Sequence, residues 1–264
     1  MSNTTRTEPR RTRLRASAFA VALGLVAALS QASHAQETKQ MNQVQTTAPS
    51  ASETLTARQQ AIVLIAAFAT AGDMGKLNTA LNQGLYAGLT TSDAREVLVQ
   101  LYAYAGFPRS LNALTELMKV VQARRQRGIH DAPGREPSHA IPKGDALRAA
   151  GTANQTKLVG QPVSGAIFEF APAIGEYLQS HLFGAIFERD DLDWQSRELA
   201  TVGMLSALPG AEAQLQSHMT MSMNTGLTAA QMQQAVQVLG ERAGTDTGQR
   251  ARDALAKALA ARPR

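Results

Sequence analysis

Two stretches of the chain repeat one spacing of glycine and a Gly-Leu-Thr turn. Gly72 precedes Gly88-Leu89-Thr90 by the same interval that separates Gly210 from Gly226-Leu227-Thr228. Glycine commonly ends a helix and threonine commonly begins one. Between these turns the apolar residues follow a helical period, and no segment alternates as a half-buried strand would. The sequence therefore predicts an all-α protein in which one helical plan occurs twice.

Capping residues and glycines predict where the helices begin and end. Thr56 and Gln59 form a capping-box pattern before an Ala/Ile/Leu-rich run that stops at Gly72. A cluster of aromatic residues between Phe168 and Phe187 is expected to lie in the core. In the first half of the chain, a second helix is predicted to end at Gly88, a third to span 90–106 and a fourth to run from Pro108 to about 127. Later helices are predicted at 145–158, 193–208, 211–225, 228–239 and 244–259.

The composition of the chain changes between these helical stretches. Residues 128–144 are rich in proline, glycine and charge, which is typical of a linker. We therefore expect two tandem helical units. The predicted divisions are a signal peptide at 1–35, a disordered tether at 36–54, a first unit at 55–127, the linker at 128–144 and a second unit at 145–264.

The first 35 residues have the pattern of an export signal. Several arginines precede an apolar run from Ala16 to Leu29, which is too short for an ordinary membrane span, and cleavage is expected after Ala35. Arg10-Arg11 offers a twin-arginine alternative, but Arg13 stands where that signal usually has an aromatic residue. We expect a periplasmic or secreted protein without a stable membrane span after cleavage, exported by the general route.

Charge and cysteine content exclude several functions. Removing the predicted signal removes five arginines and one glutamate, which leaves 21 basic and 20 acidic residues, or +1 in place of +5. A nearly neutral chain gives no electrostatic support for binding nucleic acid. The chain has no cysteine, so thiol redox chemistry, thiolate metal sites and haem attachment through cysteine are excluded.

Several motifs resemble one known family. They are the run Leu101–Arg109 (LYAYAGFPR), Phe183-Gly184, the stretch from Leu192 to Arg197-Glu198-Leu199, and the repeated Gly-Leu-Thr turns. Together they resemble the carboxymuconolactone decarboxylase family, which also includes alkylhydroperoxidase-like members. The resemblance implies a compact helical unit that assembles as a ring of six. Two units in one chain would then imply a homotrimer.

The resemblance also implies which residues are reactive. Peroxidase members carry a glutamate, a Cys-x-x-Cys pair and a histidine; Glu198 and His218 match the first and last of these. Ala211 and Gln214 stand at the cysteine positions, so thiol peroxidase activity is excluded because no thiolate is available. The matching places in the first unit are Gln59 and Ala80, which gives that unit a degenerate site.

Helix geometry allows Glu198 and His218 to meet across a hairpin that turns near Pro209-Gly210. A carboxylate beside an imidazole would orient the ring and favour its protonated form. We expect a lyase that uses His218 and Glu198 for proton transfer on a small carboxylated lactone or related acid, without a cofactor or metal. Arg109 and Arg197 are the candidates for binding the substrate carboxylate.

Each of these expectations has an alternative in which the residues have a structural role and no chemical one. The His218–Glu198 pair could be an inherited buried hydrogen bond in a non-catalytic binding or assembly module, and the arginines could be structural or solvated. Met219, Met221 and Met223 beside His218 also suggest soft copper ligands. Residues two apart point to opposite sides of a helix, so packing is the favoured role for these methionines.

Overall fold

Thr56 begins the first helix and Gly72 ends it, which confirms the prediction from the capping pattern. In the computed structural model, which describes residues 53–262, the Thr56 hydroxyl accepts from the Gln59 N–H and the Gln59 side chain accepts from the Thr56 N–H. Gly72 then adopts the left-handed conformation, with φ 73°, which is open to glycine at low cost.

The described residues are helical and contain no β-strand, which confirms the predicted fold class. In chain order the helices are α1 (Ala57–Ala71), α2 (Met74–Tyr86), α3 (Thr91–Gln100), α4 (Tyr102–Gln126), α5 (Gly144–Val159), α6 (Ala166–Phe170), α7 (Pro172–Tyr177), the π-helical η1 (Leu178–Ile186), α8 (Trp194–Ser206), α9 (Glu212–Asn224), α10 (Ala229–Val238), the π-helical η2 (Leu239–Ala243) and α11 (Thr245–Ala260).

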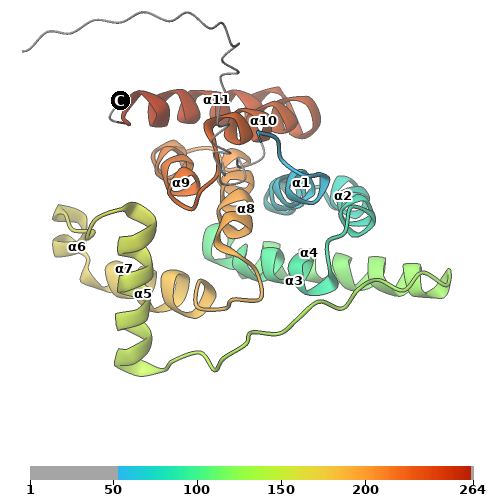
Figure 1. The fold of residues 1–264 in the computed structure, drawn as a ribbon, viewed down its shortest axis with the longest axis horizontal. Helices are drawn as coiled ribbons and strands as arrows, with labels where there is room; N and C mark the ends of the chain where they lie inside the picture. The colour runs from blue at the N-terminus through green and yellow to red at the C-terminus, as the bar shows by residue number, and fades with distance from the viewer. Residues whose placement is uncertain (1–52, 263–264) are drawn as a thin grey trace, which may run out of the picture. The chain divides into compact units, whose positions relative to one another are not determined.

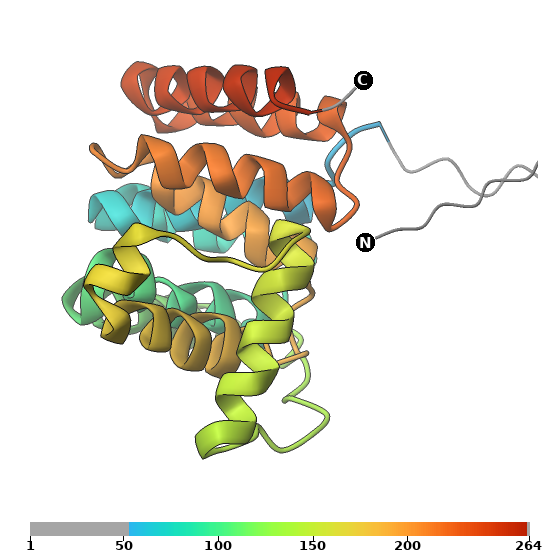
Figure 2. The same ribbon diagram turned by 90° about the vertical axis from the view of Figure 1, so that its left-hand side faces the viewer.

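Helices far apart in the sequence lie side by side in layers. Figures 1 and 2 show α10 and α11 on one side of a middle layer that holds α1, α2, α8 and α9, and they show α3 and α4 on the other side. Helix α5 and the segment from α6 to η1 flank this stack. One continuous apolar cluster includes side chains from both halves of the chain, so the two predicted units share a core.

The helices of the two halves follow the same order. Three glycines of the first half and three of the second have positive φ and stand 138 positions apart; the pairs are Gly72 and Gly210, Gly88 and Gly226, and Gly106 and Gly244. Each pair lies in the turn that follows corresponding helices, or at the kink before the last helix of each half. This correspondence supports the predicted duplication, and the division into two units stays a prediction.

Helices α1 and α8 cross at the centre of the fold, where Gly203 permits close contact. A Cβ atom at Gly203 would overlap the backbone carbonyl of Val63 and crowd the side chain of Ala66. Ala66 and Val63 are fully buried, so neither can move away into solvent. The absence of a side chain at Gly203 therefore sets the distance between the two central helices.

The predicted end of the third helix was wrong. Helix α3 ends at Gln100, and a short helical turn from Tyr102 leads to Gly106, whose φ of 78° and ψ of 164° kink the chain inside α4. Pro108 follows this kink and lies in the first turn of the straight part of α4, where proline needs no backbone donor. The turn before the kink points the Tyr102–Ala105 segment toward the second half.

The linker at 128–144 is non-helical up to Lys143, but it is not a free tether. Its carbonyls at Ala132 and Pro133 accept hydrogen bonds from the N–H groups of Thr91 and Ser92 at the start of α3. These backbone donors lie at a helix N-terminus, where the helix itself offers no acceptor. The linker therefore provides the hydrogen-bond acceptors for the first backbone N–H groups of α3.

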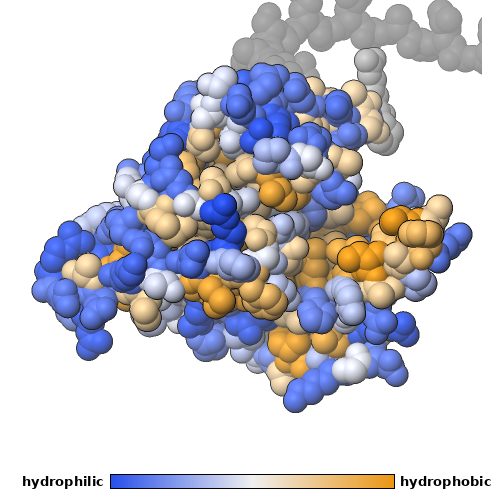
Figure 3. Space-filling view, turned by 180° about the vertical axis from the view of Figure 1, so that it is seen from behind, coloured by the Kyte–Doolittle hydropathy of each residue, from blue (hydrophilic) through white to orange (hydrophobic). Residues whose placement is uncertain are grey.

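The expectation that the aromatic segment forms core is only partly correct. Phe183 and Phe187 are buried, but Phe170 is 88% exposed and Tyr177 is 58% exposed. Helices α6 and α7 contribute no buried residue. The helix is interrupted at Ala171 between them, and neither short helix is long enough to cover a core. Figure 3 shows the resulting apolar patch at the edge of the molecule.

The predicted signal peptide, and the tether up to residue 52, lie outside the described residues. Within residues 53–262, no helix combines the length and apolar character that crossing a membrane requires.

The close crossing at Gly203 yields a stability prediction. Replacing Gly203 with alanine should lower the free energy of unfolding by about 1–3 kcal/mol, because the new methyl group overpacks a buried site. Gly75 provides a matched control, since a Cβ there would meet only the Asp73 side chain at ordinary contact distance. Urea denaturation of both variants measures the difference; an unchanged midpoint for Gly203→Ala would contradict the role given to this crossing.

Candidate functional site

The side chains of Glu198 and His218 meet between α8 and α9. His218 Nδ1 lies 2.8 Å from Glu198 Oε2, a normal hydrogen-bond distance. Glu198 is fully buried and His218 is only 6% exposed. The turn through Pro209-Gly210 therefore brings the carboxylate and the imidazole into contact.

Glu198 determines which nitrogen of the imidazole carries a proton. A carboxylate oxygen accepts, so His218 Nδ1 is the donor, and Nε2 is the atom left to exchange a proton with a ligand. Within residues 53–262, no group forms a hydrogen bond with Nε2. Glu198 Oε1 is buried and also lacks a protein partner. The pair thus retains unused polar atoms at which a ligand or water could bind.

Tyr104 is a third member of this site. Its ring packs edge-on against the His218 ring, with centroids 5.8 Å apart, and its hydroxyl accepts from Thr201 at 3.3 Å. Burial raises the pKa of Tyr104 far above its usual value, and the negative charge of Glu198 raises it further. The hydroxyl therefore remains protonated at physiological pH and can act as a donor.

Tyr104 did not stand out as a site residue in the sequence, although it lies in the Leu101–Arg109 run that carries the family resemblance. It belongs to α4, whereas Glu198 and His218 belong to α8 and α9. The spacing within one half cannot reveal a residue that comes from the other half. The available signal was the unusual motif itself.

Gln100 connects Tyr104 to the rest of the interior. It is fully buried, and its side-chain amide donates to the Thr201 hydroxyl at 2.8 Å and to the Arg197 carbonyl at 3.0 Å. The Thr201 hydroxyl in turn contacts the Tyr104 hydroxyl. A chain of hydrogen bonds therefore runs from α3 through α8 to the ring that packs against His218.

Arg197 does not occupy the position that a substrate-binding arginine would need. Its side chain is completely buried, and its guanidinium lies 3.1 Å from a Glu96 oxygen and 3.4 Å from an Asp191 oxygen. It also donates to the backbone carbonyl of Arg189 at 2.7 Å. Its charge is already balanced by protein carboxylates, and this position supports a structural role.

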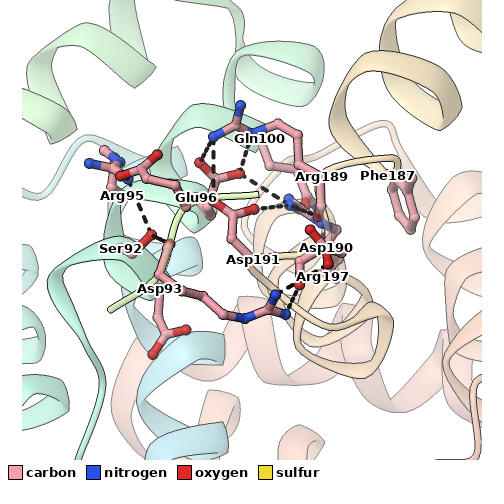
Figure 4. Close-up of polar contacts among 12 residues, drawn as sticks. Ser92, Asp93, Arg95, Glu96, Gln100, Phe187, Arg189, Asp190, Asp191 and Arg197 are labelled. Atoms are coloured by element: carbon pink, nitrogen blue, oxygen red, sulfur yellow. Dashed lines mark hydrogen bonds and ion pairs between the residues drawn. The ribbon is translucent and has the colours of Figure 1, made fainter. Parts of the chain in front are cut away.

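Two arginines and two carboxylates form this buried cluster (Figure 4). Arg189 donates two hydrogen bonds of 2.8 Å to the two oxygens of Glu96. Burial raises the pKa of Glu96, but the Arg189 hydrogen bonds and the Arg197 charge outweigh it, so that this pKa falls below its usual value. Burial and the Glu96 charge raise the pKa of Asp191. Burial lowers the pKa of Arg197 despite its acidic partners.

Arg109 lies away from the histidine. It is exposed on α4, and its guanidinium covers Gly72 at the end of α1. A cation is favourable beside the carbonyl groups that end a helix. Within the described residues Arg109 forms no hydrogen bond or ion pair with His218 or Glu198. The structure therefore brings together two of the four predicted site residues.

The first-half counterpart of Glu198 is Gln60 rather than the predicted Gln59. Gln59 closes the capping box at Thr56, whereas Gln60 faces a small pocket that Ala80 also lines. Gln60 and Ala80 stand 138 positions before Glu198 and His218, the interval that also separates the paired glycines. The one-residue error arose because α8 has one more residue before this position than α1 does.

Neither His181 nor the methionines beside His218 take part in the hydrogen bond between His218 and Glu198. His181 is near Tyr102, with 3.4 Å between its Nδ1 and the tyrosine hydroxyl. Met219 and Met223 belong to the main core cluster, whereas Met221 packs in a separate cluster with residues of α5 and η1. The methionine side chains therefore divide between two clusters, as packing residues would. No group of three or more His, Asp or Glu in the described part of the chain is arranged to hold a metal ion.

His218 is almost closed off from solvent, with 6% of its surface exposed. Neither His218 nor Glu198 lines any of five surface pockets found on the described residues. Leu158, Phe183 and neighbouring side chains of α5 and η1 pack against Tyr104. Helix α5 and η1, which open the second half, therefore cover the Tyr104 side of the candidate site.

Comparison with known families identifies the second half. Residues 172–258 match the model of the carboxymuconolactone decarboxylase family. The matched region runs from α7 into α11 and includes Glu198 and His218, but it leaves out Tyr104. A search of curated proteins finds no match.

The buried cluster yields a prediction about stability. Glu96→Ala should reduce the free energy of unfolding by about 3–5 kcal/mol, because it leaves the buried charge of Arg197 poorly paired. Glu136 is the matched control: it pairs with Arg95 but is 71% exposed, so Glu136→Ala should cost at most about 1 kcal/mol. Denaturant titration distinguishes the two; equal losses would show that burial of the cluster is unimportant.

The raised pKa of Tyr104 yields a prediction at alkaline pH. The folded protein holds this proton more tightly than the unfolded chain, where tyrosine ionises near pH 10. The stabilisation is therefore complete below about pH 10 and declines as the pH rises further. Thermal unfolding between pH 8 and 11.5 should show this decline, and Tyr104→Phe should reduce it. Tyr177→Phe is the matched control, because Tyr177 is exposed. An identical decline in Tyr104→Phe and Tyr177→Phe would show that Tyr104 is not the source of the alkaline loss of stability.

Proposed function

Because residues 172–258 match the model of the carboxymuconolactone decarboxylase family, we propose that the protein is a cofactor-free carbon–carbon lyase. The proposed substrate is a small carboxylated lactone or related acid. The observation that carries the proposal is the 2.8 Å contact between His218 Nδ1 and Glu198 Oε2 in a nearly closed site. Such a pair orients an imidazole for proton transfer.

His218 supplies the proton in this proposal. Loss of CO₂ from the substrate leaves an electron pair in a dienolate, and the protonated His218 ring donates its Nε2 proton to the dienolate carbon. The ring then becomes neutral and keeps its Nδ1 proton, which remains hydrogen-bonded to Glu198 Oε2. Glu198 therefore holds the ring in place and balances its charge while the ring is protonated.

Tyr104 supplies a neutral donor beside the histidine. Its raised pKa keeps the hydroxyl protonated, and its ring contacts His218. A dienolate carries negative charge on oxygen, and a fixed donor stabilises such charge as it develops. We assign Tyr104 this role. We assign the substrate carboxylate to neither Arg197, which is committed to Glu96 and Asp191, nor Arg109, which covers Gly72.

Burial of the site favours a second candidate function. His218 is 6% exposed, and none of the five pockets described above reaches it. A closed histidine–glutamate pair with no access for a substrate would be a structural hydrogen bond. The chain would then be a non-catalytic binding or assembly module that retains the family fold.

Exposed apolar grooves support the proposed homotrimer. One groove of about 470 Å³ between α3 and α4 is lined by Leu114, Met118 and Val121, and Met118 is 64% exposed. A second groove of about 680 Å³ between α10 and α11 includes Leu255 and Leu259. Exposed apolar surface of this kind suits contact with another copy of the chain. Export to the periplasm or the medium remains a prediction.

Activity measurements distinguish the two functions. Purified protein is incubated with a panel of carboxylated lactones, and CO₂ release is followed together with substrate loss. If the lyase proposal holds, His218→Ala should lower kcat about 10²- to 10⁴-fold. His181→Ala is the matched control, because His181 lies on η1 beside Tyr102 and outside the pair, and it should retain activity.

The remaining outcomes decide against the lyase. Absence of turnover by the unmodified protein across the panel would favour the binding or assembly module. Equal turnover by the unmodified protein and His218→Ala would remove His218 from the mechanism. Circular dichroism of each variant separates a loss of chemistry from a loss of fold.

A further inference from the structure

A small pocket opens between α1 and α2 in the first half of the chain. Its volume is about 130 Å³. Its floor is apolar and buried, and its rim carries two side-chain amides and one guanidinium. The lining residues are Ala57, Gln60, Ala61, Leu64, Ala80, Gln83, Ala87 and Arg242.

This pocket is the first-half equivalent of the His218 site. Ala80 stands 138 positions before His218, and Gln60 stands 138 before Glu198. Arg242 stands 138 positions after Tyr104. Each site is therefore completed by a residue from the kink segment of the other half.

The substitutions in the first half change what the site can bind. Ala80 is a small residue where the second half has the imidazole of His218, so space remains between α1 and α2. Gln60 is uncharged where the second half has a carboxylate. Arg242 brings a positive charge where the second half has the neutral hydroxyl of Tyr104. The acid–base pair is replaced by a cation over an apolar cavity.

Arg242 has no acidic partner among the described residues. Its guanidinium forms a short contact with the side-chain oxygen of Gln83, it takes part in no ion pair, and no carboxylate lines the pocket. Arg242 is exposed at the rim, where a ligand can reach it, and a guanidinium matches the two oxygens of a carboxylate with paired N–H donors. An unbalanced guanidinium beside two amides therefore suits an anionic ligand.

We propose that this pocket binds a small monocarboxylate of two to four carbons. Arg242 would hold the carboxylate, with the amide of Gln83 beside it. The apolar floor formed by Ala61, Leu64 and Ala80 would receive the hydrocarbon tail. A cavity of about 130 Å³ is well below the roughly 300–1,000 Å³ of pockets that take drug-sized ligands, which favours a ligand of only a few carbons. The inference concerns a site separate from His218 and does not depend on lyase activity.

The test is a titration of the isotope-labelled full-length chain with acetate, propionate and butyrate, followed by NMR at constant ionic strength. The backbone amides of Ala61 and Ala87 report on the pocket. Saturable shifts are expected with the carboxylates, and acetamide, which lacks the charge, should produce none. Inorganic phosphate serves as the comparison for non-specific attraction of anions.

Two variants locate the site. Arg242→Leu should weaken carboxylate binding at least tenfold, whereas Arg252→Leu should leave it unchanged, because Arg252 bonds to Gln249 and lines a different pocket. Ala80→Leu keeps Arg242 but fills the cavity, so it should abolish butyrate binding. Thermal unfolding of each variant confirms that it is folded.

Several results would overturn the proposal. Shifts that never saturate, equal shifts with acetamide, or equal shifts with phosphate would show that the pocket does not select carboxylates. Binding that persists in Arg242→Leu would remove the guanidinium from the site. Butyrate binding that persists in Ala80→Leu would place the ligand elsewhere.

Discussion

The buried cluster around Arg197 is the interaction on which the arrangement of the two halves depends. A guanidinium without solvent must be paired, and its partners come from α3 of the first half, through Glu96, and from the turn before α8, through Asp191. Gln100, one turn beyond Glu96, then reaches Thr201. Because buried charges tolerate little displacement, this cluster fixes α3 against α8. Because α4 follows α3 directly, fixing α3 in this way also places Tyr104, in the first turn of α4, against His218.

The crossing of α1 and α8 explains why each site draws on both halves. The two central helices lie next to each other, and α3–α4 and α10–α11 cover opposite sides of them (Figures 1 and 2). The segment before Gly106 therefore ends at the second-half site, and the segment before Gly244 ends at the first-half pocket. Tyr104 is the residue of the first segment that lies at the second-half site, and Arg242 is the residue of the second segment that lies at the first-half pocket. A site in this fold thus belongs to neither half alone.

The sequence predicts the local features of this structure better than the distant ones. Thr56, Gly72, Thr90 and Thr228 define helix ends because capping involves neighbouring residues. The Glu198–His218 contact also follows from one short hairpin. The burial of Arg197 and the position of Tyr104 depend on contacts across about 100 residues, which no spacing within one half specifies. Phe170 is exposed because the helix is interrupted at Ala171, and the apolar composition of this segment does not predict that interruption.

The two halves together separate what the fold requires from what chemistry requires. The paired glycines and the Thr90 and Thr228 capping boxes are kept in both halves, so they belong to the architecture. The three positions that face each site differ in every case, with Gln60, Ala80 and Arg242 at one site and Glu198, His218 and Tyr104 at the other. A helix pair that packs well around Ala80 does not need a histidine–glutamate hydrogen bond to be stable. The fold itself therefore does not require that bond, and its presence in the second half is consistent with the proposed proton transfer.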